Sequence, residues 1–147
     1  MSLEISLVSG GDVEIENWKR RKQRAIEQAK EGLNLIVPLV EQYYDDRRPL
    51  ENKCLYNGSI THNLSRMAKE VGLYEVLWKP EEIGAATGKD IIYLLDEGLK
   101  LLKDDPGHYR MFNAENGWGS YEDLVGFVEG YLNACIEYPD GIIKVSR

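Results

Sequence analysis

A histidine and an asparagine stand side by side in "GSITHNLSRMA", residues 58–68, where a glycine turn leads into an apolar helix. Thr61 is the predicted N-cap of that helix, so His62 and Asn63 fall in its first turn, where backbone N–H groups lack helical partners. A neutral imidazole at this point can donate or accept one hydrogen bond. The pair therefore suits either a structural bond to a loop or contact with a ligand.

An aromatic residue is held between two glycines in "NAENGWGSYED", residues 113–123. Gly117 and Gly119 allow the backbone to take positive φ and to present the indole of Trp118 at a fixed position. Loop residues that a rigid scaffold positions often recognise a ligand or a partner. The alternative is that Trp118 only staples the loop to the core, beside Tyr121 at the start of the next helix.

Two adjacent glutamates follow a tryptophan in "LWKPEEIG", residues 77–84. Neighbouring positions on a helix diverge by ~100°, so Glu81 and Glu82 cannot form one catalytic carboxylate pair. Pro80 suits the first position of a helix, where the two carboxylates would complement the helix dipole. We expect Trp78 to pack beneath this turn.

The remaining residues of potential chemistry do not form a known pattern. His62 and His108 lie 46 positions apart, and Cys54 and Cys135 lie 81 apart, so neither pair has the spacing of a metal site. Cys135 falls on an apolar helical stripe, where a thiol behaves as a small hydrophobe. Phosphate-binding, zinc-protease, nucleophile-elbow and EF-hand motifs are absent from the sequence, and we predict no metal and no cofactor.

The elements that position these residues are mostly helical. The fold class predicted over residues 1–147 is mainly α, a single-domain bundle of four to six helices with a two-stranded β-ribbon from the chain termini. Leu3, Ile5 and Leu7 alternate with polar residues, as in a half-buried strand, and Ile143 and Val145 do the same near the end.

Helical periodicity runs from about Val13 to Tyr44, with a kink or break expected between Gly32 and Pro38. The charged stretch that follows, up to Ser59, reads as a connecting loop, and the next helix is expected over Thr61 to Val71. Two capping boxes mark the starts of two later helices, and they are formed by Thr87 with Asp90 and by Ser120 with Asp123.

The 147 residues carry 18 basic and 25 acidic side chains, a net charge of −7. Such a chain repels phosphate backbones, so nucleic-acid binding is disfavoured. The basic run "WKRRKQR", residues 18–24, would spread around a solvated helix, with a phosphate-binding stripe as the alternative. No apolar run approaches the ~20 residues needed to cross a bilayer, and a reduced cytoplasmic protein without membrane contact is the simplest interpretation.

Several of these motifs occur together: "THNLSRMAKEVGLYEVLWKPEEIG", "NGWGSYEDLVGFVEGYLNAC", "YPD" and a terminal "KVSR". In this combination the chain resembles a family of small bacterial and phage-borne proteins over roughly residues 57–147. The resemblance implies a recurring protein and supplies neither an activity nor catalytic residues. It does imply that one constellation unites His62, Asn63, Trp78, Trp118 and Arg147.

The leading functional hypothesis is a non-enzymatic binding module in which the Thr-His-Asn-Leu turn and the Asn-Gly-Trp-Gly loop face one cleft. Its partner would be a protein or a small polar ligand, since aromatic walls with a few directional polar groups are typical of recognition sites. The ligand-binding residues predicted for this cleft are His62, Asn63, Trp78, Trp118 and Tyr121.

Two other functions remain open from sequence. In a small-substrate enzyme, with or without a metal, His62 would act as general acid or base, oriented by Glu81, Glu82 or Glu122. Alternatively, the acidic surface is itself the function, and an immunity-type or inhibitor protein covers a basic partner through charge complementarity. The sequence does not decide whether the protein is an enzyme, and homo-oligomerisation also stays open.

Overall fold

The chain divides into two compact units in a computed structural model. The structure describes residues 2–9, 11–49 and 53–147, without the side chains of residues 11–13. Residues 1–8 and 54–147 form one unit, here the sheet unit, and residues 9–53 form the other, here the hairpin unit. The single-domain expectation stays a prediction, because two units can still unfold together.

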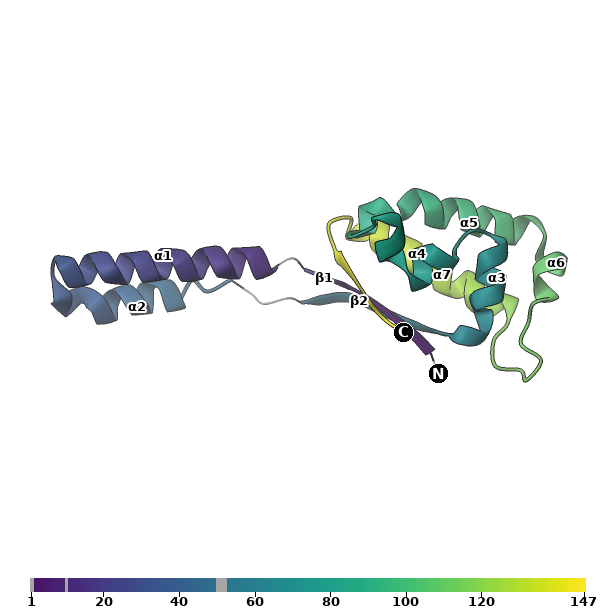
Figure 1. Ribbon diagram of the computed structural model, residues 1–147, viewed down its shortest axis with the longest axis horizontal. Helices are drawn as coiled ribbons and strands as arrows, with labels where there is room; N and C mark the ends of the chain where they lie inside the picture. The colour runs from purple at the N-terminus through teal and green to yellow at the C-terminus, as the bar shows by residue number, and fades with distance from the viewer. Residues whose placement is uncertain (1, 10, 50–52) are drawn as a thin grey trace. The chain divides into compact units, whose positions relative to one another are not determined.

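The hairpin unit contains two antiparallel helices, α1 (Gly11–Glu31) and α2 (Val37–Asp45) (Figure 1). The predicted break is confirmed, since a short 3₁₀ turn, η1 (Asn34–Ile36), separates the helices and Pro38 lies at the start of α2. The indole N–H of Trp18 donates to the Tyr44 carbonyl oxygen at 2.7 Å and joins the two helices.

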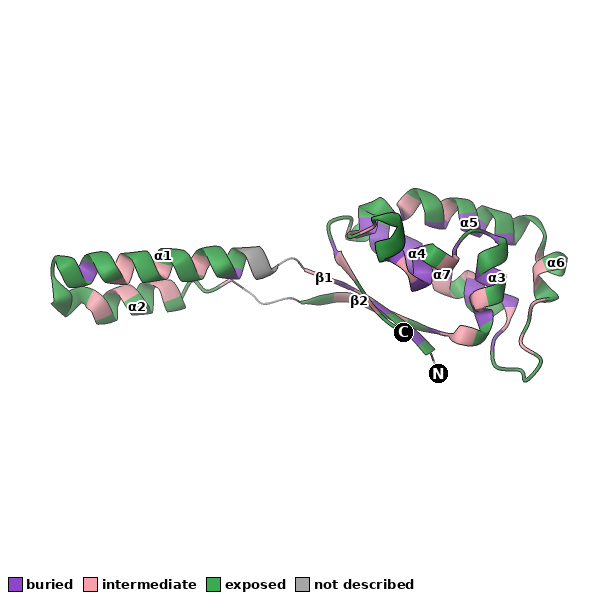
Figure 2. Ribbon diagram, viewed as in Figure 1, coloured by how far each residue is buried: buried purple, intermediate pink, exposed green. Residues whose placement is uncertain are grey.

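The sheet unit is built on three antiparallel strands: β1 (Ser2–Val8) lies between β2 (Cys54–Thr61) and β3 (Ile142–Ser146). The predicted alternation of β1 is confirmed. Its inward side chains are at most 1% exposed, and these are Leu3, Ile5 and Leu7. Helices cover this inner face of the sheet, and buried residues concentrate between the two layers (Figures 1 and 2).

The predicted two-stranded ribbon is wrong in one respect. The terminal strands do pair, with Ile5 opposite Val145, but β2 adds a third strand where a loop was expected. Residues 50–52 of that expected loop lie outside the described part. Gly58 does not make a turn: it faces the core opposite Ile5, and a Cβ there would lie 2.8 Å from the hydroxyl of Tyr56. The glycine lets β2 pack closely beneath the helices.

Five α-helices complete the sheet unit, and mainly α is confirmed as the class. Seven α-helices occur in the described residues of the whole chain, against the four to six expected. The five in this unit are α3 (Ser65–Glu70), α4 (Tyr74–Trp78), α5 (Ile92–Asp104), α6 (Pro106–Arg110) and α7 (Tyr121–Glu137). The short helix α6 forms where the sequence "DDPG" indicated only a stop.

Both capping boxes are confirmed. The backbone N–H groups of Ala86 and Thr87 donate to the Asp90 carboxylate, each at 2.9 Å, and hold the pKa of that carboxyl below its usual value. This box begins a 3₁₀ turn, η4 (Gly88–Asp90), just before α5. The second box, Ser120 with Asp123, begins α7 and anchors the end of the loop that carries Trp118.

Candidate functional site

His62 lies where β2 leaves the sheet and enters a 3₁₀ turn, η2 (His62–Leu64). The hydroxyl of Thr61 accepts a hydrogen bond from the backbone N–H of Asn63 at 3.3 Å, so Thr61 is the N-cap as predicted. Leu64 is fully buried at the other end of the turn. A paired strand and a core residue thus fix the backbone on either side of His62 and Asn63.

A buried tryptophan holds the imidazole of His62. Trp78 is 3% exposed, and its indole Nε1–H donates to Nδ1 of His62 at 2.9 Å. An indole nitrogen can only donate, so Nδ1 must carry the lone pair and the neutral ring carries its proton on Nε2. The Nε2–H group of His62, on the other side of the ring from Nδ1, is therefore a hydrogen-bond donor.

Arg147 contacts the backbone of Trp78. Arg147 Nη1 donates to the Trp78 carbonyl oxygen at 2.8 Å and to Oε1 of Glu81 at 2.6 Å. The hydrogen bond from Arg147 lowers the pKa of the Glu81 carboxyl. The ring of Tyr74 stacks on Trp78 with their centroids 5.6 Å apart.

The Asn-Gly-Trp-Gly loop is tied to the turn beneath it. Asn63 Nδ2 donates to the carbonyl oxygen of Trp118 at 3.0 Å, and Oδ1 of Asn116 accepts from the Trp118 backbone N–H at 3.0 Å. Both flanking glycines have positive φ, +77° at Gly117 and +136° at Gly119, as predicted. The Trp118 side chain is 75% exposed, so it does not act as a hydrophobic staple.

A surface hollow of about 760 Å³ lies between the turn and the loop. Its walls include Ser59, Thr61, His62, Asn63, Asn116 and Trp118. The structure therefore brings three of the five predicted ligand-binding residues to one hollow. Hydrogen bonds join Asn63 to Trp118, and they join His62 to Trp78 and Trp78 to Arg147. His62 and Asn63 are neighbours in the chain, so the two groups meet at the turn.

The other two predicted residues lie elsewhere. Trp78 is in the core behind His62 and supports the hollow without lining it. Tyr121 is 6% exposed, and its hydroxyl donates to the Leu102 carbonyl oxygen at 2.8 Å, which makes it a core residue that ties α7 to α5. Its position as the first residue of a capped helix gave no sign of this contact.

Asn116 and Ser59 line the hollow but were not predicted to do so. Asn116 was visible in the sequence only as half of an Asn-Gly turn signal. Ser59 was missed because β2 was missed. The alternation of β2 is weak, since the strand contains Asn57 and Gly58.

The carboxylates proposed to orient His62 have other partners. Glu81 binds Arg147, and Oε1 of Glu122 accepts from Nε of Arg110 at 2.9 Å.

His108 packs its ring against that of Phe112, with centroids 5.7 Å apart. Within residues 2–9, 11–49 and 53–147, no three histidine, cysteine, aspartate or glutamate side chains come together as metal ligands would.

The two cysteines should differ sharply toward a thiol reagent. Cys135 is fully buried on α7, and burial raises the pKa of its thiol to about 12, whereas Cys54 is exposed. Because only the thiolate reacts, one thiol per native chain should react rapidly with Ellman's reagent and both should react in denaturant. Loss of the fast phase in Cys54→Ser is the control. Two fast native thiols would contradict the buried position of Cys135.

Comparisons of this chain with known proteins found no relative. No family model, curated protein or solved structure matches the chain. Among the described helices, none has the length and apolar character to cross a membrane.

Proposed function

We propose that the protein is a non-enzymatic binding module, and that the hollow between the Thr-His-Asn-Leu turn and the Asn-Gly-Trp-Gly loop is its recognition site. The ligand class that fits is a polar molecule or side chain with a hydrogen-bond acceptor next to a flat apolar group. The resemblance to small bacterial and phage-borne proteins stays part of this proposal, because the same motifs supply the residues around the hollow.

The hydrogen bond from Trp78 to His62 carries the proposal. A general base must offer a lone pair to its substrate, but the Nδ1 lone pair of His62 already accepts the indole N–H. The other ring nitrogen carries a proton, so it suits binding of a carbonyl or carboxylate oxygen better than removal of a proton. This favours recognition over the acid–base alternative.

The exposed indole supplies the apolar wall. Tryptophan is a large and rigid contact surface, and an aromatic partner stacked on it gains about 0.5–1.5 kcal/mol beyond the area that it buries. Asn63 and Asn116 use their side chains to hold the Trp118 backbone in place. The site is therefore preorganised, which reduces the entropic cost of binding.

Nuclear magnetic resonance with two defined probes, benzamide and benzoate, tests this function. Each combines a planar ring with an acceptor oxygen, so millimolar additions should shift the indole N–H signal of Trp118 and the Nε2–H signal of His62. Trp118→Ala should weaken binding about tenfold or more, because the stacking surface is lost.

The matched control is Tyr93→Ala, which removes another exposed aromatic ring, 71% exposed, from α5. It should leave the probe affinity unchanged. Absence of any shift at Trp118 and His62 with both probes would refute this ligand class. A proton found on Nδ1 of His62 would remove the argument against a catalytic base.

A further inference from the structure

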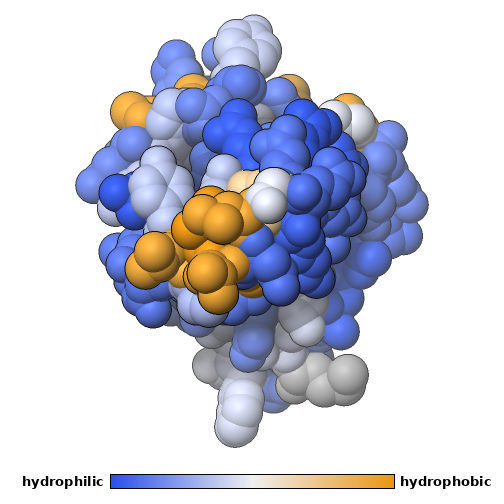
Figure 3. Space-filling model, turned by 90° about the vertical axis from the view of Figure 1, so that its left-hand side faces the viewer, coloured by the Kyte–Doolittle hydropathy of each residue, from blue (hydrophilic) through white to orange (hydrophobic). Residues whose placement is uncertain are grey.

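The hairpin unit exposes a stripe of apolar side chains. Ile36, Leu39 and Tyr43 recur at helical spacing along one side of η1 and α2, and they are 37%, 71% and 53% exposed. Leu33 and Leu35 extend this stripe into the connection and are 58% and 86% exposed. Figure 3 shows an apolar patch at this end of the hairpin surrounded by hydrophilic residues.

The hairpin unit buries few of its apolar side chains. Among its described residues only Ile15 and Ala29 are buried apolar side chains. A segment of this size rarely gains enough from so small a core, and oligomerisation is one of the usual remedies. The stripe therefore marks a surface that needs a partner.

A complementary hollow lies in the same unit. It has a volume of about 510 Å³ and its walls include Trp18, Tyr43, Tyr44 and Arg47. The guanidinium of Arg47 stacks on the ring of Tyr43, 3.8 Å from its centroid, so one wall of the hollow continues the apolar stripe. Leu35 lies beyond one end of the stripe and this hollow lies beyond the other.

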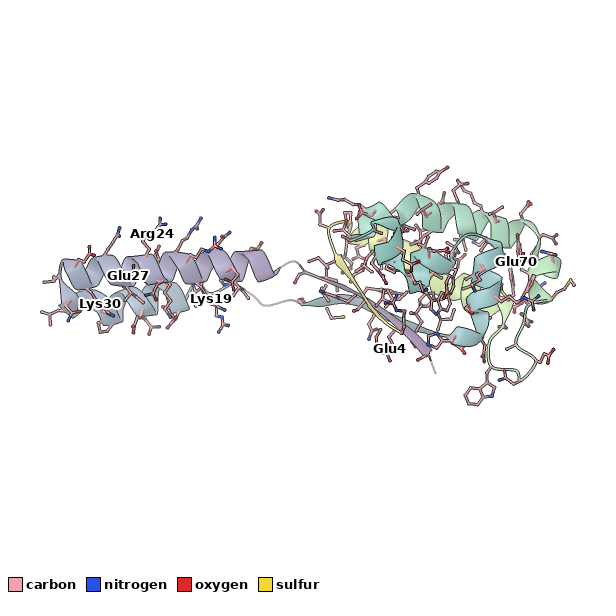
Figure 4. All side chains as sticks on the ribbon, viewed as in Figure 1. Glu4, Lys19, Arg24, Glu27, Lys30 and Glu70 are labelled. Atoms are coloured by element: carbon pink, nitrogen blue, oxygen red, sulfur yellow. The ribbon has the colours of Figure 1, made fainter. Side chains whose placement is uncertain are left out.

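The charge of the hairpin is divided between these two ends. Residues 25–44, which include the connection, carry three acidic and one basic side chain, whereas the rest of the unit, residues 9–24 and 45–53, carries eight basic and six acidic ones. Side chains of α1 such as Lys19, Arg24, Glu27 and Lys30 extend into solvent (Figure 4). Over the whole unit the charges balance at nine of each sign, and the sheet unit carries the entire net charge of −7.

We propose that the hairpin unit is a homodimerisation element, and that α2 packs antiparallel against α2 of a second copy. Centred on Leu39, this pairing places Ile36 against Tyr43 of the copy and Leu35 at the hollow beside Trp18. It also places the acidic end of each hairpin over the basic section of the other. A two-fold contact requires such a self-complementary surface.

A lipid surface fits the stripe less well. Interfacial insertion of an apolar helix is usually supported by clustered basic residues that attract anionic lipids. Here the clustered basic residues lie at the hollow, whereas the Leu33–Leu39 end of the stripe is flanked by Glu31 and Glu41 against Lys30. The charge pattern therefore favours a second copy.

Sedimentation velocity of the full chain from low to high micromolar concentration tests the proposal. The wild-type protein should be a dimer, and Leu39→Glu should weaken the dimer by roughly 100-fold or more because it places two like charges in an apolar contact. Leu35→Ala should weaken it about tenfold by emptying the hollow. Leu101→Glu, at a 48% exposed leucine on α5, is the control and should remain dimeric.

Leu39→Lys provides a second arm that does not depend on the stability of one variant. It should be monomeric alone, and an equimolar mixture with Leu39→Glu should form a heterodimer, because the two positions meet near the symmetry axis. A monomeric wild type, a Leu39→Glu protein as dimeric as the control, or a mixture that stays monomeric would each overturn the proposal. So would a monomer that sediments with phosphatidylcholine vesicles.

Discussion

Replacing Trp78 with alanine should lower the free energy of unfolding of the sheet unit by about 3–5 kcal/mol. The side chain is 3% exposed, stacks on Tyr74 and donates to Nδ1 of His62, so its loss leaves a cavity and an unpartnered ring nitrogen. Urea denaturation followed by far-ultraviolet circular dichroism measures the change.

Two companion variants separate packing from hydrogen bonding. Trp78→Phe keeps most of the ring but removes the N–H, and it should cost about 1–3 kcal/mol. Trp118→Ala removes an indole that is 75% exposed, and it should change stability by no more than about 0.5 kcal/mol. Equal destabilisation by the alanine variants of both tryptophans would mean that Trp118 is structural, and the hollow would lose its main contact surface.

Replacing Gly119 with alanine should destabilise the sheet unit by about 2–4 kcal/mol, the sum of backbone strain and overpacking. Gly119 has φ +136°, and a Cβ there would lie 2.8 Å from Thr61 Cγ2 and 3.0 Å from Leu64 Cγ. The loop can relieve this collision only by moving away from the turn. The Trp118 indole signal should therefore shift even in the folded variant.

Gly117→Ala is the matched control for Gly119. Gly117 also has positive φ, +77°, but nothing lies within 4 Å of the position of a Cβ. Only the conformational cost applies there, about 1–2 kcal/mol. If the two variants were equally stable by the same urea assay, close packing of Gly119 on the turn would not be what holds the loop.

Local patterns predicted the longer helices, although they missed the short helix α6. The break before Pro38 and both capping boxes depend on residues within about four positions of one another, so the sequence states them directly. The alternation of β1 was also legible, because an inner face of Leu3, Ile5 and Leu7 needs no knowledge of its partner strand.

The third strand could not be predicted in the same way. The Asn57-Gly58 pair is a strong turn signal, yet Gly58 lies in β2. Any larger residue at this position would collide with the side chains of Tyr56 and Phe127. The pairing that stabilises β2 joins residues such as Leu3 and Ile60, which are far apart in sequence. Tertiary packing here overrides the local preference.

The residues of the candidate site also fall into those that the sequence predicted and those that only the structure placed. The residue types at the Thr-His-Asn-Leu turn and between the two glycines were enough to select His62, Asn63 and Trp118, which do meet at one hollow. Sequence alone therefore determined the longer helices, the two capping boxes and the polar and aromatic residues of interest. Only the tertiary structure decided that Trp78 bonds to His62 and that Tyr121 is in the core, because both depend on contacts between distant segments.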